Sequence, residues 1–271
     1  MVEALFQPFP MMAGRRAQVW RHQPQYRRPR HFHEEPEINL VVRGRGVMGI
    51  GDQTRSVAAG DVLAFHPGQD HVLLEASDDF DLFVMALRPE LAARAEMPVV
   101  KSATAFRLAS DIAGLADELR GLGDVTDAAC HELRLIDLFG KLQPPPAPSH
   151  VLSRRALRFQ VRQPELSGVN LARRLQTTAS SVSRHFHDDL GLTLVEHRAR
   201  MRLVQFIRAV DGGSGFTLAA LSAHFGSYAQ FHRVFHRTLG CSPREYFAGA
   251  RELLNESTFM NLDELKRSIG R

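Results

Sequence analysis

The stretch FGSYAQFHRVFHRTLGCSPREYF, residues 225–247, decides how the C-terminal half of the chain folds, because much of it occurs twice. The two copies keep a constant offset, 233 − 184 = 49, and the match extends from Thr178 and Ser227 to Glu196 and Glu245. A supersecondary unit used twice is the simplest explanation. The central repeated residues are Arg184, Phe186, His187, Leu190 and Gly191, then Arg233, Phe235, His236, Leu239 and Gly240.

Each copy contains the pattern of a short helix, a tight turn and a second helix. Thr178 and Ser227 carry hydroxyl groups in the position that caps the second helix. This pattern predicts a helix-turn-helix, whose second helix can enter the major groove of DNA. We expect Leu171 and Leu175 to face Val182 and Phe186 in the first copy, and Leu218, Leu221 and Phe225 to face Phe231 and Phe235 in the second.

The charge of the chain is divided unevenly between its halves. Residues 151–250 contain fourteen Arg, no Lys and six acidic residues, so their net charge is 14 − 6 = +8. The whole chain is +4, which leaves 4 − 8 = −4 for the rest. A solvated Arg-rich surface would give the same count, but a basic half with two helix-turn-helix units favours double-stranded DNA as the partner.

The stretch 225–247 closely resembles the signature of AraC/XylS-type transcription regulators, and LARRLQTTASSVSRHFHDDLGLTLVEHRARMRL, residues 171–203, resembles the first half of the same DNA-binding domain. One position departs from the family, which usually has Gly where this chain has His224. Because His tolerates a left-handed backbone better than most residues, we expect local strain and an intact domain.

Exposed residues in the first two turns of a recognition helix face the base edges. The resemblance to the family implies the same positions. An Arg at such a position can pair bidentately with guanine, although a salt bridge or a phosphate contact would also explain a repeated Arg. The predicted DNA-reading residues are Ser180, Ser183, Arg184, Ala229, Gln230, His232 and Arg233.

The first ninety residues predict a β-sandwich or barrel. Short apolar runs separated by Gly, Asp and Pro, such as EINLVV, DVLAF and DLFVMALR, are typical of these folds. Apolar residues then recur at helical spacing, which predicts helices over 104–122 and 126–142. Residues 143–150, QPPPAPSH, can continue neither a helix nor a strand and predict a linker.

A second informative stretch is RHFHEEPEINLVVRGRG, residues 30–46. Residues two apart on a strand share a face, so His31 and His33 can converge inside a barrel, and Glu37 keeps the same parity. The stretch resembles the first motif of the cupin family, and GDVLAFHPGQDH, residues 60–71, resembles the second. The resemblance implies a double-stranded β-helix and a set of four ligands, His31, His33, Glu37 and His71.

Two interpretations of this set remain open. Three imidazoles and a carboxylate suit Zn, Ni, Fe or Mn. Cupin sensors of AraC-type regulators also bind organic effectors without metal, and the polar side chains then hydrogen-bond the effector. His66 has the wrong parity for a ligand.

We therefore expect a multidomain chain: a cupin-like effector-sensing domain (1–100), a helical segment that resembles dimer-forming helices (101–142), a linker (143–150), an all-α tandem helix-turn-helix domain (151–250) and a tail (251–271). The expected function is effector-controlled transcription regulation by a homodimer, without enzymatic activity, with RNA polymerase an open partner. The alternative is a metal-dependent cupin dioxygenase or isomerase fused to a DNA-binding domain.

Two features favour the cytoplasm as the location. No run of eighteen apolar residues and no signal-peptide pattern occur in the sequence. Cys130 and Cys241 lie far apart and suit reduced thiols. The sequence names neither the effector nor the operator.

Overall fold

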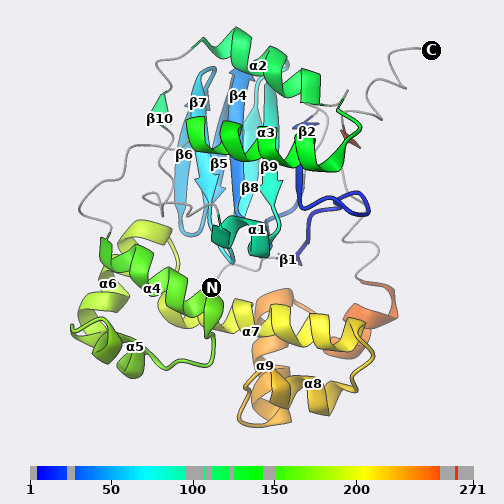
Figure 1. Ribbon diagram of the computed structural model, residues 1–271. Coiled ribbons are helices and arrows are strands. Elements are labelled where there is room, and N and C mark those ends of the chain that lie inside the picture. Colours follow the sequence, from blue (N-terminus) through cyan, green and yellow to red (C-terminus); the bar gives the residue numbers. More distant parts are fainter. Residues whose placement is uncertain are drawn as a thin grey trace.

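Strands form the N-terminal part of the chain and helices the C-terminal part (Figure 1). The computed structural model describes residues 5–22, 28–94, 106–107, 111–122, 125–142, 151–250 and 260–261. The strands are β1 (Leu5–Phe6), β2 (Ala17–His22), β3 (His31–Phe32), β4 (Glu37–Arg43), β5 (Arg45–Ile50), β6 (Gln53–Ala58), β7 (Asp61–Phe65), β8 (His71–Ala76), β9 (Asp81–Leu87), β10 (Phe106–Arg107) and β11 (Met260–Asn261). The helices are α1 (Pro89–Arg94), α2 (Ile112–Gly121), α3 (Ala128–Lys141), α4 (Val151–Arg162), α5 (Gly168–Arg174), α6 (Ala179–Leu190), α7 (Leu194–Asp211), α8 (Phe216–Ser222), α9 (Tyr228–Leu239) and α10 (Pro243–Glu245), followed by a π-helical turn (Tyr246–Ala250).

The strands form two facing sheets, which confirms the predicted N-terminal fold class. Their orders are β1-β3-β8-β5-β6 and β10-β7-β4-β9-β2-β11. Gly44 makes the turn between β4 and β5 with a φ of 76°, and a side chain there would collide with Ser77 and Phe80. On β4, Ile38 and Leu40 pack outward against helices, whereas Val41 packs inward between the sheets. Glu37 and Asn39 share the inward parity, so β4 places polar groups inside an apolar barrel.

Helices α2 and α3 cover the outer face of the larger sheet (Figure 1). The helix predicted over 104–122 starts too early, because residues 106–107 pair with β7 as strand β10 and α2 begins only at Ile112. Asp111 caps that start by accepting a hydrogen bond from Ala113. The predicted linker 143–150 lies outside the described residues, as does most of the tail, of which residues 260–261 pair with β2. The buried apolar residues of the two helices and their ends are Ala116, Leu119, Leu122, Leu135, Leu138, Phe139 and Leu142.

The C-terminal helices form two helix-turn-helix units joined by α7, which confirms the predicted all-α class (Figure 1). Thr178 and Ser227 cap α6 and α9 as predicted, each accepting a backbone hydrogen bond three residues on. Both copies continue into a capping box, Thr193 with Glu196 and Ser242 with Glu245. His224 has a φ of 61°, so it occupies the left-handed conformation that Gly usually takes in the family.

One packing prediction for the second unit is wrong. Leu218 and Leu221 are 63% and 53% exposed and do not face the recognition helix. Helix α8 instead turns its alanine face inward, so that a small-residue surface packs against the large aromatic side chains Phe231 and Phe235. Phe225 is buried there as predicted. In the first unit, Leu171 and Leu175 share a core with Val182 and Phe186 as predicted. The buried alanines of the second unit are Ala219, Ala220 and Ala223.

The barrel contributes directly to the core of the second unit. Phe6 of β1 and Phe32 of β3 belong to the same buried cluster as Phe206 of α7 and Phe235 of α9. Phe32 is fully buried, and the guanidinium of Arg200 lies 5.1 Å from the centre of its ring. The two halves of the chain therefore share one apolar cluster.

Candidate functional site

Three histidines converge inside the barrel. His31 of β3 lies opposite His71 of β8 in the strand register, and His33 follows two residues after His31. All three are buried, and each offers a ring nitrogen within 4.8 Å of those of the other two. Strand parity predicted that His31 and His33 share a face, the cupin resemblance added His71, and the structure brings the three side chains together.

Backbone carbonyls fix the orientation of each ring. The Nδ1 atoms of His31, His33 and His71 lie 2.9, 2.7 and 3.2 Å from the carbonyl oxygens of residues 29, 35 and 69. A carbonyl oxygen only accepts, so each Nδ1 donates, and in a neutral imidazole Nε2 is then left with a lone pair. Rings held in this way by an outer hydrogen bond are the usual arrangement of metal-binding histidines.

Glu37, the fourth residue of the predicted ligand set, contacts two of the three histidines. Its Oε2 lies 2.8 Å from Nε2 of His33 and 3.2 Å from Nε2 of His71, whereas the compact ligand group comprises the three histidines alone. Burial opposes ionisation of Glu37, but His71 and His33 hold the pKa of this carboxyl far below its usual value. A carboxylate oxygen and a lone-pair nitrogen at these distances need a shared cation, which is a proton or a metal ion.

The fit of a metal ion to this cluster is supported by a second feature. The buried Nε2 atom of His31 has no hydrogen-bond partner within the described part of the chain. Burial, together with the nearby Arg28, His71 and His33, holds the pKa of His31 well below its ordinary value, so the ring stays neutral. Neutral imidazoles and a carboxylate are the donor set of transition metals.

A cavity of about 40 Å³ adjoins the cluster. Besides His31, Glu37 and His71, its polar lining comprises His22, Arg28 and Asn39, none of which the sequence analysis selected. Asn39 could have been found, since it follows Glu37 at the same parity on β4. Arg28 precedes the predicted strand and gave no comparable signal.

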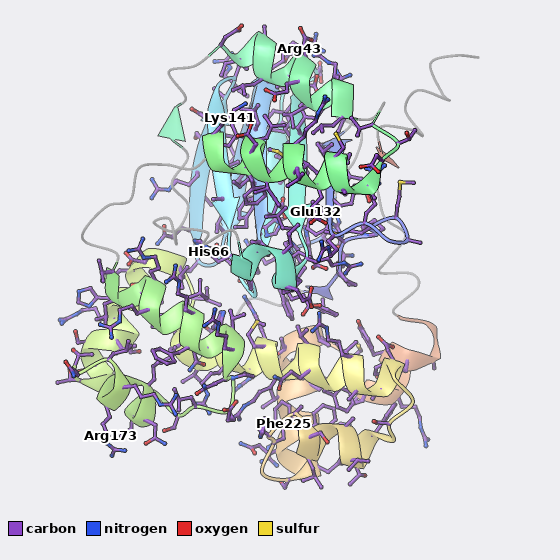
Figure 2. The ribbon with its side chains drawn as sticks, viewed as in Figure 1. Arg43, His66, Glu132, Lys141, Arg173 and Phe225 are labelled. Carbon is purple, nitrogen blue, oxygen red and sulfur yellow. The ribbon has the colours of Figure 1, made fainter. Side chains whose placement is uncertain are left out.

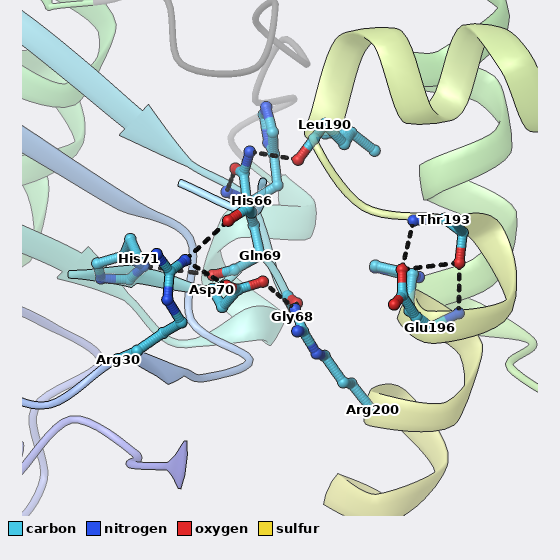
Figure 3. A network of polar contacts seen from close by, with 12 residues as sticks. Arg30, His66, Gly68, Gln69, Asp70, His71, Leu190, Thr193, Glu196 and Arg200 are labelled. Carbon is cyan, nitrogen blue, oxygen red and sulfur yellow. Dashed lines mark hydrogen bonds and ion pairs between the residues drawn. The ribbon is translucent and has the colours of Figure 1, made fainter. Parts of the chain in front are cut away.

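The segment that brings His71 into the cluster also contacts helix α7 (Figure 3). Asp70 accepts hydrogen bonds from Arg200 of α7 at 2.5 Å and from Arg30 at 2.7 Å. Arg200 also donates to the carbonyl of Gly68, and Nε2 of His197 donates to that of Pro67 at 2.9 Å. Burial of the Asp70 carboxyl opposes its ionisation, but Arg200 and Arg30 lower its pKa.

Further contacts extend this interface along the helices. The amide of Asp52 donates to the carbonyl of Gly191 at the end of α6, and Gln69 donates to that of Leu190. Arg208 of α7 pairs with Glu34 at 2.5 Å. Burial raises the pKa of Glu34 to about 7, against the opposing effect of Arg208. His66, at the end of the barrel facing the helices (Figure 2), lies outside the histidine cluster.

The seven predicted DNA-reading side chains lie on two exposed helix faces. Ser180, Ser183 and Arg184 are exposed on α6. The second set, Ala229, Gln230, His232 and Arg233, is exposed on the first two turns of α9. Gln230 already accepts a hydrogen bond from the amide of Gly226, which orients it at the helix start. Helix α7, ~27 Å long at 1.5 Å per residue, separates the two units.

Comparison with known protein families matches residues 18–133 to the AraC-like ligand binding domain and residues 171–249 to a helix-turn-helix domain. The chain belongs to the AraC family. This AraC-type chain is thus a DNA-binding transcription regulator with an N-terminal ligand-binding domain. Because the family is one of regulators and not of enzymes, the alternative of a cupin dioxygenase or isomerase is not supported.

Solved structures similar to this AraC-family chain share low sequence identity with it. ToxT from Vibrio cholerae is 13% identical, with 86% of this chain and 96% of that chain covered and a TM-score of 0.47. ToxT with bound unsaturated fatty acid is 12% identical, with 85% and 93% covered and a TM-score of 0.48. A cupin protein from Bacteroides fragilis is 18% identical, with 27% and 64% covered and a TM-score of 0.24.

No curated protein matches this AraC-family chain in sequence. Among the described residues, no helix is both long and apolar enough to cross a membrane.

Proposed function

We propose that this regulator binds specific DNA through α6 and α9 under the control of a metal ion or small effector inside the barrel. The DNA-reading residues are the seven exposed side chains on α6 and α9 defined above. The sensing residues are His31, His33, Glu37 and His71. The sensor extends over residues 1–100 and the DNA-binding domain over residues 151–250, and the chain acts in the cytoplasm, where its DNA partner is.

The observation that carries this proposal is the dual role of residues 67–71. His71 faces the barrel cluster, while Asp70 pairs with Arg200 on the helix that joins the two DNA-binding units. Phe32 has the same dual position, since its neighbours His31 and His33 face inward while its own ring packs on α7. A shift of either segment on ligand binding would therefore act on the helix that positions α6 and α9.

A divalent transition metal would be held by the three Nε2 atoms, with Glu37 beside it. In a regulator, such an ion would supply binding energy and a coordination site for an effector. No step of catalysis is needed for that role.

Two partner proposals follow from the DNA-binding assignment. Paired subunits would bind two half-sites, and we expect the dimer contact at α2 and α3. RNA polymerase is the expected partner if the regulator activates transcription.

The test measures zinc stoichiometry and DNA affinity of the full chain. We expect one zinc ion per chain in the wild type and no bound zinc in His31→Ala or His71→Ala, while His66→Ala keeps the ion. DNA fragments are first selected from a random library by the wild-type protein. Affinity for the selected DNA should then change at least fivefold when zinc is added to chelator-treated protein.

The interface has a matched control pair. Asp70→Asn should keep zinc binding but lose most of the change in DNA affinity, because it weakens the contact with Arg200. Asp81→Asn removes a similar ion pair, with Arg21, that is remote from α7, and should respond like the wild type. Equal responses of Asp70→Asn and the wild type would contradict transmission through this contact.

A further inference from the structure

The cavity beside the histidine cluster is lined by polar and apolar side chains together. The polar lining includes Arg28 and Asn39, besides His31 and Glu37. The apolar lining comes from both sheets, Met48 and Leu73 from one and Leu82 and Val84 from the other. A ligand matching this cavity therefore has a polar end and a short apolar part.

Arg28 gives the polar lining of the cavity a fixed positive charge. The side chain is only 8% exposed and faces the cavity from the segment before β3. Burial lowers the pKa of Arg28 to about 10, with Glu37 and Glu35 acting in the opposite direction, so the guanidinium stays charged at neutral pH. A buried guanidinium is suited to bidentate recognition of a planar carboxylate.

Asn39 adds a hydrogen-bond acceptor to the polar lining. Its Oδ1 atom is buried and has no hydrogen-bond partner among the described residues. An unsatisfied buried acceptor is costly, by ~1–3 kcal/mol, and a ligand hydroxyl would satisfy it. His31 belongs to the same lining, and its Nε2 atom, which also lacks a partner among the described residues, would be taken by the metal ion of the proposed function.

The size of the cavity limits the ligand. One water needs ~10–15 Å³ by the same measure, so about 40 Å³ holds a few groups of water size. Pockets for drug-sized molecules measure ~300–1,000 Å³, which excludes long-chain or aromatic ligands here.

We propose that the effector is a short aliphatic 2-hydroxy acid, whose carboxylate pairs with Arg28 and whose hydroxyl donates to Asn39. Its aliphatic carbon faces Met48, Leu73, Leu82 and Val84. This inference rests on the proposed sensing function of the barrel. A divalent cation at the histidines adds two positive charges beside Arg28, against the one negative charge of Glu37, so bound metal favours the acid.

Calorimetric titration of the full chain, with and without one equivalent of zinc, tests this assignment. The probes are lactate, propionate without the hydroxyl, neutral lactamide and inorganic phosphate. We expect lactate to bind the zinc-loaded protein at least tenfold more tightly than propionate, and lactamide and phosphate not to bind.

Variants then identify the groups responsible. Arg28→Met should weaken lactate binding at least tenfold, and Asn39→Leu should remove the preference for lactate over propionate. Arg43→Met, an exposed arginine on the same strand as Asn39, should bind lactate like the wild type. Circular dichroism and urea unfolding verify that each variant is folded, and if Arg28→Met fails this criterion, Arg28→Lys should bind with intermediate affinity.

The outcomes separate this inference from the proposed function. Zinc binding without any lactate binding overturns the hydroxy-acid site and leaves the metal site standing. Lactate binding that depends on Arg28 in a protein that binds no zinc supports the acid site and removes the metal from the proposed function. Phosphate or propionate binding as tightly as lactate overturns the assignment.

Discussion

His197 shows how a single buried ring makes the stability of the chain depend on pH. Burial lowers the pKa of His197 to about 4, although its hydrogen bond to Pro67 acts in the opposite direction and Arg200 and His66 add repulsion. Its Nδ1 atom is buried without a partner among the described residues, so a proton there would be unpaired. The folded chain therefore disfavours the charged ring.

We predict that the contribution of His197 to the free energy of unfolding falls as the pH decreases from about 6.5 to about 4, whereas Glu34, whose pKa burial raises to about 7, contributes in the opposite direction. In that interval the unfolded chain binds a proton at His197 that the folded chain does not, so acid favours unfolding by up to about 3 kcal/mol. Urea unfolding at pH 7 and pH 5 measures the difference. His31, whose pKa is also lowered, contributes in the same direction.

The variant His197→Gln isolates this contribution, because Gln keeps a donor for the Pro67 carbonyl but does not titrate. Between pH 7 and pH 5, its unfolding free energy should change in the stabilising direction relative to that of the wild type. His236→Gln, at an exposed position on α9, should leave the slope unchanged. An unchanged slope in His197→Gln would contradict the assignment.

The residues of the site that the sequence predicted follow from strand parity or from the cupin resemblance. His31 and His33 share a face because they lie two residues apart, whereas the meeting with His71 of the distant strand β8 was implied by the resemblance alone. Arg28 and the contact between Asp70 and Arg200 were not predictable in this way. They depend on how an irregular segment and a distant helix pack on the barrel.

At the level of elements, the recognition helix α9 carries the sharpest prediction for DNA readout. Arg233 is exposed in its second turn and can pair bidentately with guanine. Arg233→Ala should cost ~1–3 kcal/mol of binding to the selected DNA and relax specificity at one base pair. Competition binding against single-base variants of that DNA measures both effects.

Arg237, exposed near the C-terminal end of the same helix, provides the control. Arg237→Ala should weaken all sequences by the same factor or have no effect. If Arg233→Ala also weakens every sequence equally, Arg233 contacts a phosphate and does not read a base.

Helix patterns predicted the type of each element more reliably than its partners. The caps at Thr178 and Ser227 are local chemistry and were correct. Leu218 and Leu221 were predicted to face Phe231 and Phe235, yet α8 turns alanines toward these rings. The large rings leave room only for small residues, which no single-helix pattern reveals.

For the whole molecule, dimerisation through α2 and α3 remains a prediction. Most apolar side chains of α2 and α3 are buried against the sheet. This packing is the simpler explanation of why apolar residues recur at helical spacing in both helices. Leu133 on α3 is 67% exposed and is the apolar residue left for a partner contact. We expect a dimer at micromolar concentration by light scattering and a shift toward monomer in Leu133→Glu.

Val169→Glu is the matched control, because Val169 on α5 is 62% exposed and the variant gains the same charge. Its oligomer mass by light scattering should equal that of the wild type. A wild-type monomer at micromolar concentration, with and without DNA, would argue against dimerisation through this segment.

The shared cluster of Phe6 and Phe32 with α7 and α9 also limits how such regulators can be recombined. A chimera that joined these DNA-binding helices to an unrelated sensor would lose both rings and leave a hole in the second unit. Truncations of this kind cost ~3–5 kcal/mol per buried Phe. Shuffling the two halves as independent modules, by engineering or in evolution, therefore requires that β1 and β3 travel with the helices or that new side chains fill their place.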